Sequence, residues 1–260
     1  MAVNHVPVTL SAYGVSMCLG SCEDPFAVEA LPRRARALGW TEAAVPRADL
    51  EYACTADDGV LRLRCNGETV TSAYDRDALV DAFDNHLKIE LALRAPHHVF
   101  VHAGVVGWRG GAIVIPGRSR AGKTTLVEAL VRAGADYYSD EFAVLDADGR
   151  VHPYAIPLAI RAPGRRAAVP VDALGGRAGT VPLPVDRIVI TTYQPSARWR
   201  PRTISPALGL LALMDNTVAA QQAPEKTMPV LRRAVERAQL IRSRRGGAGA
   251  VADALLGATG

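Results

Sequence analysis

The sequence contains few aromatic residues and no long apolar run. Aromatic residues make up 5% of the 260 residues and hydrophobic residues 49%, so Ala, Val, Leu and Ile must form most of the core. No apolar segment approaches the ~20 residues of a membrane-spanning helix. Residues 1–14 lack the basic start and apolar segment of a secretory signal. We therefore expect a cytoplasmic protein without a membrane partner.

Cysteine is scarce, with residues at positions 18, 22, 54 and 65. None of them forms a CxxC pair or lies near a histidine at the spacing of a zinc finger. This pattern favours reduced, buried thiols over a metal site.

Lysine is rarer still and occurs only at positions 88, 123 and 226. The formal net charge of +4 therefore comes almost entirely from arginine. The arginines are spread along the chain without interleaved aromatic residues, so nucleic acid is not an expected partner. Such a basic surface is either solvated or favours anionic ligands.

The patterning divides the chain into an N-terminal α/β region at residues 1–95 and a second region at residues 96–260, on which we expect the first to pack. In the first region we predict strands at residues 6–10, 51–56 and 61–67 and a short helix at 33–38 that begins near Pro32. An amphipathic helix is predicted at residues 77–94, because apolar residues recur there every four positions.

The second region alternates strands and helices. Strands are predicted at residues 98–106, 112–116, 142–145 and 187–193, and helices at 124–134, 205–214 and 230–240. Residues 112–116 are wholly apolar, which is typical of a strand buried on both faces. Residues 242–249 are interpreted as a flexible basic loop before a last short helix.

A Walker A pattern, GxxxxGK[ST], follows the apolar strand at 112–116 directly and opens the helix at 124–134. It comprises Gly117, Arg118, Ser119, Arg120, Ala121, Gly122, Lys123 and Thr124, with Thr125 next to it. Glycines let the backbone curl so that N–H groups point at phosphate oxygens, and the helix N-terminus adds partial positive charge. Lys123 can reach the β- and γ-phosphates and Thr124 can ligate Mg²⁺. The pattern predicts a phosphate-binding loop.

Two adjacent carboxylates, Asp140 and Glu141, follow Lys123 by 17 and 18 residues and precede the predicted strand at 142–145. Beside a phosphate loop, one carboxylate can hold Mg²⁺ and the other can accept the proton of a hydroxyl group. His102 precedes the loop by fifteen residues; on its spacing alone it is either a site residue or a hydrogen-bonded strand histidine.

These elements together resemble the catalytic domain of HPr serine kinase/phosphorylase and HPr-kinase-related proteins, some of which phosphorylate a serine of a ribosomally made peptide such as a lasso-peptide precursor. The resemblance spans His102 to Arg161, about a quarter of the chain, and rests on the histidine, the loop and the acidic pair in that order. It implies an α/β fold with a mixed sheet and flanking helices, akin to phosphoenolpyruvate carboxykinase. It also implies a homo-oligomer, without fixing the number of subunits.

By this resemblance Asp140 is the catalytic base, Glu141 and Thr124 organise Mg²⁺ beside Asp140, and His102 lies near the acidic pair. Arg161 falls where the family carries a glutamate-x-arginine element, but Ala159 replaces the glutamate. The reverse, phosphorolytic activity is tied to that region of the family, so this departure argues against it. The loop also departs from the family, because Arg120 stands where a glycine is usual.

The sequence therefore predicts an ATP- and Mg²⁺-dependent kinase that phosphorylates a hydroxyl group, most simply a serine of a peptide or protein. Two alternatives remain open at this point. One is a kinase for a small-molecule alcohol. The other is a nucleotide hydrolase or a nucleotide-binding regulator without kinase activity.

Overall fold

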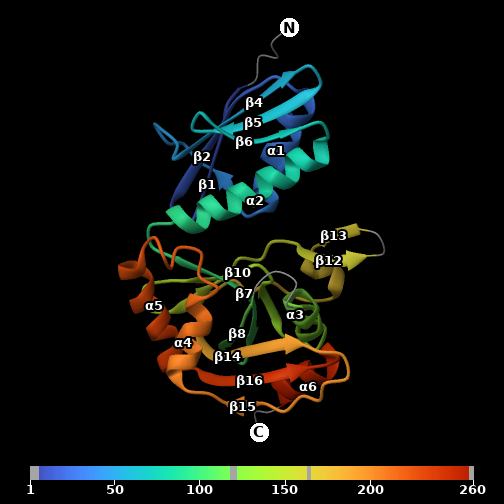
Figure 1. Cartoon of the computed structure of the whole chain (residues 1–260), viewed down its shortest axis with the longest axis vertical. Coiled ribbons are helices and arrows are strands. Elements are labelled where there is room, and N and C mark those ends of the chain that lie inside the picture. The colour runs from blue at the N-terminus through green and yellow to red at the C-terminus, as the bar shows by residue number, and fades with distance from the viewer. Residues whose placement is uncertain (1–5, 118–121, 163–164, 258–260) are drawn as a thin grey trace. The chain divides into compact units, whose positions relative to one another are not determined.

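The computed structural model describes residues 6–117, 122–162 and 165–257, without the side chains of residues 161, 162, 165 and 166. The chain divides into two compact units, Met1–His97 and His98–Gly260 (Figure 1). The sequence pattern placed this division after residue 95. Within the described residues, no helix combines the length and apolar character needed to cross a membrane.

The first unit is a six-stranded sheet with two helices packed against it and against each other. The strands are β1 (Val8–Ala12), β2 (Val15–Cys22), β3 (Thr41–Glu42), β4 (Leu50–Asp57), β5 (Val60–Cys65) and β6 (Glu68–Ala73), in the order β3-β1-β2-β4-β5-β6. The helices are α1 (Pro25–Ala37) and α2 (Arg76–Arg94). The four cysteines all lie in this unit as free thiols, three of them buried, as expected from the sequence.

The first unit differs from the prediction in its strands and in one helix. Strands β2, β3 and β6 were not anticipated, and α1 begins at Pro25 rather than near Pro32, which lies inside the helix. The reason is a stronger start signal upstream, because the Asp24 carboxylate accepts a hydrogen bond from the Ala27 N–H and Pro25 occupies the first turn.

The second unit is built on an eight-stranded mixed sheet whose main path runs β11-β10-β7-β8-β14-β16-β15, with β9 paired to β7. The strands are β7 (Val99–Trp108), β8 (Gly111–Pro116), β9 (Asp136–Ser139), β10 (Phe142–Leu145), β11 (Arg150–His152), β14 (Leu183–Tyr193), β15 (Arg202–Thr203) and β16 (Gln239–Arg245). Strands β8, β14 and β16 are parallel, whereas β7 pairs with β8 in the antiparallel sense. The expectation of a mixed α/β sheet is thereby confirmed.

Helices cover both faces of this sheet. Helices α3 (Lys123–Arg132) and α6 (Ala248–Gly257) share one core with Ile113 and Ile115 of β8. Helices α4 (Pro206–Met214) and α5 (Pro224–Glu236) share the other core with Val114 of the same strand. All six residues of β8 are buried, which confirms the expected strand buried on both faces. A small hairpin, β12 (Leu158–Ala162) and β13 (Arg165–Val169), and a 3₁₀ turn, η1 (Val171–Leu174), complete the unit.

The prediction for residues 230–249 was wrong in two respects. Helix α5 begins and ends earlier than the expected helix, at Pro224 and Glu236. The supposed flexible loop begins inside β16, which pairs with β14 in parallel from Gln239 to Arg245. The physical reason is a non-local pairing, since β14 supplies the partner backbone for a segment whose own composition is basic and polar.

Candidate functional site

The turn after β8 leads into α3 and carries the Walker A pattern. Gly117 N–H donates to the His102 carbonyl at 3.1 Å, and Gly122 adopts a left-handed conformation with φ +80° before α3 begins at Lys123. A side chain at Gly122 would be strained there and would meet the Arg245 guanidinium. Arg118, Ser119, Arg120 and Ala121 lie outside the described residues.

Lys123 is the first residue of α3. Its Nζ donates to the Gly117 carbonyl at 2.6 Å, so the side chain reaches back to the residue that follows β8. Burial lowers the pKa of Lys123, and the nearby carboxylates of Glu141 and Asp140 oppose that shift. The ammonium group therefore lies within electrostatic reach of both members of the acidic pair.

Thr124 and Asp140 meet in a direct hydrogen bond. The Thr124 hydroxyl donates to Asp140 Oδ2 at 3.0 Å, although the two residues are 16 positions apart. Asp140 lies in the sharp connection between β9 and β10, and the Ser139 hydroxyl accepts hydrogen bonds from the N–H groups of Glu141 and Phe142. The connection is thereby fixed, and the carboxylate is held against the first turn of α3.

Asp140 is 5% exposed, and its remaining contacts are also polar. The Tyr137 hydroxyl lies 3.1 Å from Asp140 Oδ1 and 2.8 Å from the Ile156 carbonyl, and the Ala159 N–H approaches Oδ2 at 3.4 Å. Burial raises the pKa of Asp140; the Thr124 hydrogen bond opposes the shift, and the nearby Glu141 charge adds to it. A carboxylate with a raised pKa is better suited to accept a proton than an ordinary surface aspartate.

Lys123, Thr124 and Asp140 line one cavity of about 620 Å³. Its lining combines the start of α3, the acidic pair, the backbone of β12 and the ends of β14 and β16: Gly122, Lys123, Thr124, Thr125, Glu128, Asp140, Glu141, Ala159, Ile160, Tyr193, Arg245, Gly246, Gly247 and Ala248. The volume falls within the range of about 300–1,000 Å³ that is common for small-molecule sites.

Two further residues that the sequence predicted for the site are His102 and Arg161. The His102 backbone pairs with Phe142, the residue after Glu141, and its ring packs on the Phe142 ring at 4.6 Å. His102 is not part of the cavity lining among the described residues. The backbone of Arg161 belongs to β12, but its side chain lies outside the described part of the structure.

The sequence marked Arg242–Arg245 only as a basic loop, either solvated or able to hold a peptide acceptor, and did not predict that Arg245 contacts the Walker A turn. Arg245 is the last residue of β16 and is 2% exposed, and its guanidinium donates to the Gly122 carbonyl at 2.7 Å. The sequence pattern had grouped it with the surface loop residues. The sequence signal was weak, because only the Gly-Gly pair followed by a helix of small residues resembles the turn–helix order of the Walker A region.

The donor set suits Mg²⁺ better than a softer metal. Thr124 Oγ1 and the Asp140 carboxylate are hard oxygen atoms, they lie 3.0 Å apart, and Glu141 lines the same cavity. Among the described residues no group of three or more His, Cys, Asp or Glu side chains converges. A site with few protein carboxylates fits Mg²⁺, which in phosphate-binding sites keeps several waters and shares the ligand's phosphate oxygens.

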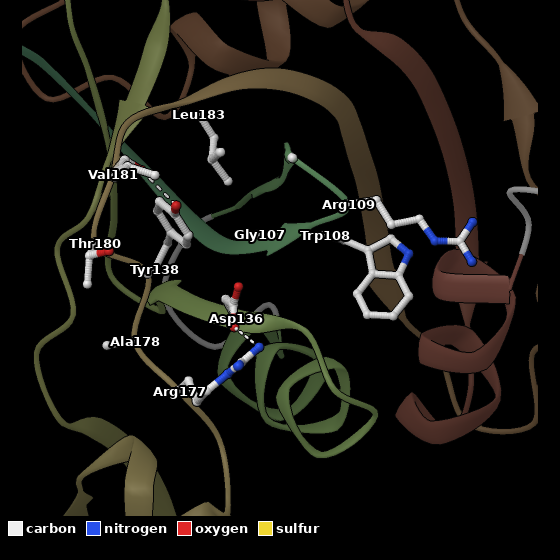
Figure 2. A pocket seen from close by; sticks show the side chains of 12 residues that line it. Gly107, Trp108, Arg109, Asp136, Tyr138, Arg177, Ala178, Thr180, Val181 and Leu183 are labelled. Atoms are coloured by element: carbon white, nitrogen blue, oxygen red, sulfur yellow. Dashed lines mark hydrogen bonds and ion pairs between the residues drawn. The ribbon is translucent and has the colours of Figure 1, made fainter.

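A second cavity, of about 340 Å³, lies at the turn between β7 and β8, which is the opposite end of β8 from the Walker A turn (Figure 2). Two pairs of its polar groups are joined, whereas the buried Nε1 of Trp108 has no hydrogen-bond partner among the described residues. The Tyr138 hydroxyl donates to the Val181 carbonyl at 2.7 Å, and Arg177 pairs with Asp136 at 3.2 Å. These contacts connect the segment before β14 to β9. The cavity lined by Asp140 and Glu141 is therefore the stronger candidate for chemistry.

Comparison with models of known protein families finds no match, and comparison with curated proteins finds none either.

Proposed function

We propose that the chain is a Mg²⁺-dependent kinase that transfers the γ-phosphoryl group of ATP to a hydroxyl group, most simply a serine of a peptide or protein. The hydrogen bond between Thr124 and Asp140 carries this proposal. It joins the two features that phosphoryl transfer requires, a phosphate-binding turn at a helix N-terminus and a buried carboxylate beside the place where the phosphate would lie.

The phosphate chain of the donor would lie against the start of α3. Backbone N–H groups at the helix N-terminus favour anions, and Lys123 adds a full positive charge next to them. The Lys123 ammonium donates to the Gly117 carbonyl. Exchange of this neutral acceptor for phosphate oxygens would strengthen the hydrogen bond, because both partners would then be charged.

Thr124 and Glu141 would hold Mg²⁺, with the Asp140 carboxylate alongside, as the donor types in the cavity allow. The bound ion would offset the negative charge on the phosphate oxygens. Lys123 contributes to the same charge compensation from the protein side, since both carboxylates raise its pKa against the effect of burial.

Asp140 would act as the base. The acceptor hydroxyl gives its proton to the Asp140 carboxylate, its oxygen forms a bond to the γ-phosphorus, and the bond between that phosphorus and the β–γ bridging oxygen breaks to release ADP. The raised pKa of Asp140 supports this assignment, since burial makes its ionised form a stronger proton acceptor than an exposed aspartate.

Binding of nucleotide tests the first half of the proposal. We expect Mg²⁺-dependent binding of ATP by calorimetry, and a loss of about 10–100-fold in affinity in Lys123→Ala, because a charge-assisted hydrogen bond to phosphate disappears. Lys88→Ala, in the first unit, is the matched control and should bind ATP as the wild type does. Absence of ATP and GTP binding by the wild-type protein would contradict the proposal.

Phosphoryl transfer tests the second half. A pool of serine-containing peptides is incubated with the protein, Mg²⁺ and ATP, and mass spectrometry then reports peptides that gain a phosphate. The same reaction without peptides measures hydrolysis of ATP. Transfer to a peptide supports the kinase, whereas turnover of ATP that no hydroxyl acceptor accelerates would favour a nucleotide hydrolase.

A further inference from the structure

The end of the chain repeats the order of elements found at the Walker A turn. Strand β16, the pair Gly246-Gly247 and helix α6 follow one another as β8, the Walker A turn and α3 do. Both strands run parallel to β14, so both turns leave the sheet at the same edge. Lys123 and Ala248, the first residues of the two ten-residue helices, line the same cavity.

One buried side chain joins the two turns. Arg245 donates from Nη2 to the Gly122 carbonyl at 2.7 Å and from Nη1 to the Gly246 carbonyl at 3.2 Å. In a trans peptide the N–H points away from the carbonyl of the same peptide group, and the described residues contain no cis peptide. The guanidinium therefore holds the N–H groups of Lys123 and Gly247 so that both point away from it.

The charge of Arg245 has no carboxylate partner within the described part of the chain. The residue is 98% buried, its Nε has no hydrogen-bond partner among the described residues, and its electrostatic neighbour is the Tyr193 ring at 5.5 Å. A buried guanidinium that is hydrogen-bonded only to neutral groups has an uncompensated positive charge, which a nearby anion would stabilise. This charge adds to the partial positive charges at the starts of α3 and α6.

The glycines keep the second turn open. A side chain at Gly246 would lie 2.7 Å from the Ala197 carbonyl oxygen, so the backbone passes too close for any other residue. Gly247, immediately before α6, has open space around it and no side chain to cap the helix. The first N–H groups of α6 therefore have no side-chain acceptor at the capping position, where Ser, Thr, Asp or Asn usually stands.

We propose that Gly247 and the N-terminus of α6, supported by Arg245, form a second anion-binding turn that holds a second phosphate group of the ligand bound at the Walker A turn. The ligand class is a compound with linked phosphates. The inference rests on the proposed function only in taking the ligand to be a nucleotide; the binding of linked phosphates does not depend on it. The acidic pair lies beside the Walker A turn, where the Thr124 hydroxyl donates to Asp140, whereas Arg245 donates to the Gly122 and Gly246 carbonyls. The second turn therefore takes the end of the phosphate chain remote from the acidic pair.

An introduced carboxylate tests this proposal directly. In Gly247→Asp the new side chain caps α6 and competes with phosphate for the same N–H groups and for the charge of Arg245. Gly247→Asn caps the helix with the same shape but no charge. We expect calorimetry to show about 10–100-fold weaker binding of Mg-ATP, Mg-ADP and pyrophosphate in the Asp variant than in the Asn variant. ATP and ADP should be affected equally, since both retain the phosphates remote from the acidic pair.

The outcomes separate this proposal from the kinase function. Equal affinities of the Asp and Asn variants would overturn the second anion-binding turn and leave the proposed function standing. If the wild-type protein binds pyrophosphate but no nucleotide, and only the Asp variant loses it, the proposed function fails and the second turn stands. A wild-type protein that binds neither nucleotide nor pyrophosphate overturns both.

Arg245 has a separate test as the positioning residue of both turns. Arg245→Met removes the charge, and exposed Arg244→Met on the same strand is the matched control. We expect weaker pyrophosphate binding and a shallower salt dependence of the affinity in Arg245→Met only, because one positive charge no longer acts on the anion. A loss of affinity with an unchanged salt dependence would reduce Arg245 to a structural support. If Arg245→Met does not fold, the Gly247 pair still decides the proposal.

Discussion

Each unit contains a buried aspartate, and the hydrogen-bond partners of the two aspartates differ. Asp84 of α2 is 7% exposed and accepts hydrogen bonds from the Arg34 guanidinium, with Nε 3.1 Å from Oδ2. Asp140 is 5% exposed, and hydroxyl groups of Thr124 and Tyr137 donate to it. The carboxylate of Asp84 raises the pKa of Arg34, whereas burial raises the pKa of Asp140 itself. The first arrangement pairs a buried carboxylate with a full positive charge, whereas the second gives it hydrogen bonds from neutral groups.

The largest expected difference between the two aspartates is in catalysis. We expect Asp140→Asn to lower the rate of phosphoryl transfer by about 10²–10⁴-fold, because the base is lost, and to retain Mg-ATP binding by calorimetry. Asp84→Asn should transfer phosphate at the wild-type rate under conditions where it is folded. An Asp140→Asn protein with full activity would assign the base to another residue, and Glu141→Gln, measured against Mg²⁺ concentration, would then be the next variant.

The second difference is in stability. Asp84→Ala should lower the free energy of unfolding by about 1–3 kcal/mol, because Arg34 loses its partner while part of its side chain remains exposed to water. Urea unfolding followed by circular dichroism measures this change. Asn85→Ala, at an exposed position of the same helix, is the control and should stay close to the wild type. Equal effects at the two positions would show that the ion pair contributes little.

The smallest expected effect is a pH dependence of stability at Asp140. A carboxyl group whose pKa is raised by folding stabilises the folded state fully below its unfolded pKa of about 3.9, and this contribution is lost as the pH rises through the folded pKa. The asparagine of Asp140→Asn does not ionise, so this variant does not lose stability as the pH rises through the folded pKa of Asp140. Its melting temperature should therefore match the wild type near pH 4 and exceed it by about 2–4 °C at pH 7.

Exposed Asp253→Asn is the control for this measurement and should keep a constant offset from the wild type at all pH values. A wild-type protein that gains stability relative to Asp140→Asn as the pH rises would show that the Thr124 and Tyr137 hydrogen bonds outweigh burial, with the pKa of Asp140 lowered rather than raised.

The parts of the fold that sequence patterns predicted are those with local causes. The strand before the Walker A turn, the buried residues Leu126, Val127, Leu130 and Val131 of α3, and the strand after Glu141 all follow from apolar spacing within a few residues. The contact between Thr124 and Asp140 could not be read from spacing alone, since it requires β9 to return beside β7.

Residues 239–257 show why the rest could not be predicted. Arginine at three of seven positions in β16 gives no strand signal, and the Gly-Gly pair is typical of a loop. The strand exists because β14 supplies its hydrogen bonds from a segment about fifty residues earlier in the chain. Arg245 becomes part of the site through that pairing, which local composition does not encode.

The contact between Arg245 and Gly122 also has a consequence for how the protein is made. The two residues are 123 positions apart in the chain. At a synthesis rate of about 5–20 residues per second, the ribosome adds Arg245 about 6–25 seconds after Gly122. During that interval the Gly122 carbonyl lacks the hydrogen bond from Arg245, so this support of the Walker A turn forms only after the segment around Arg245 has been synthesised.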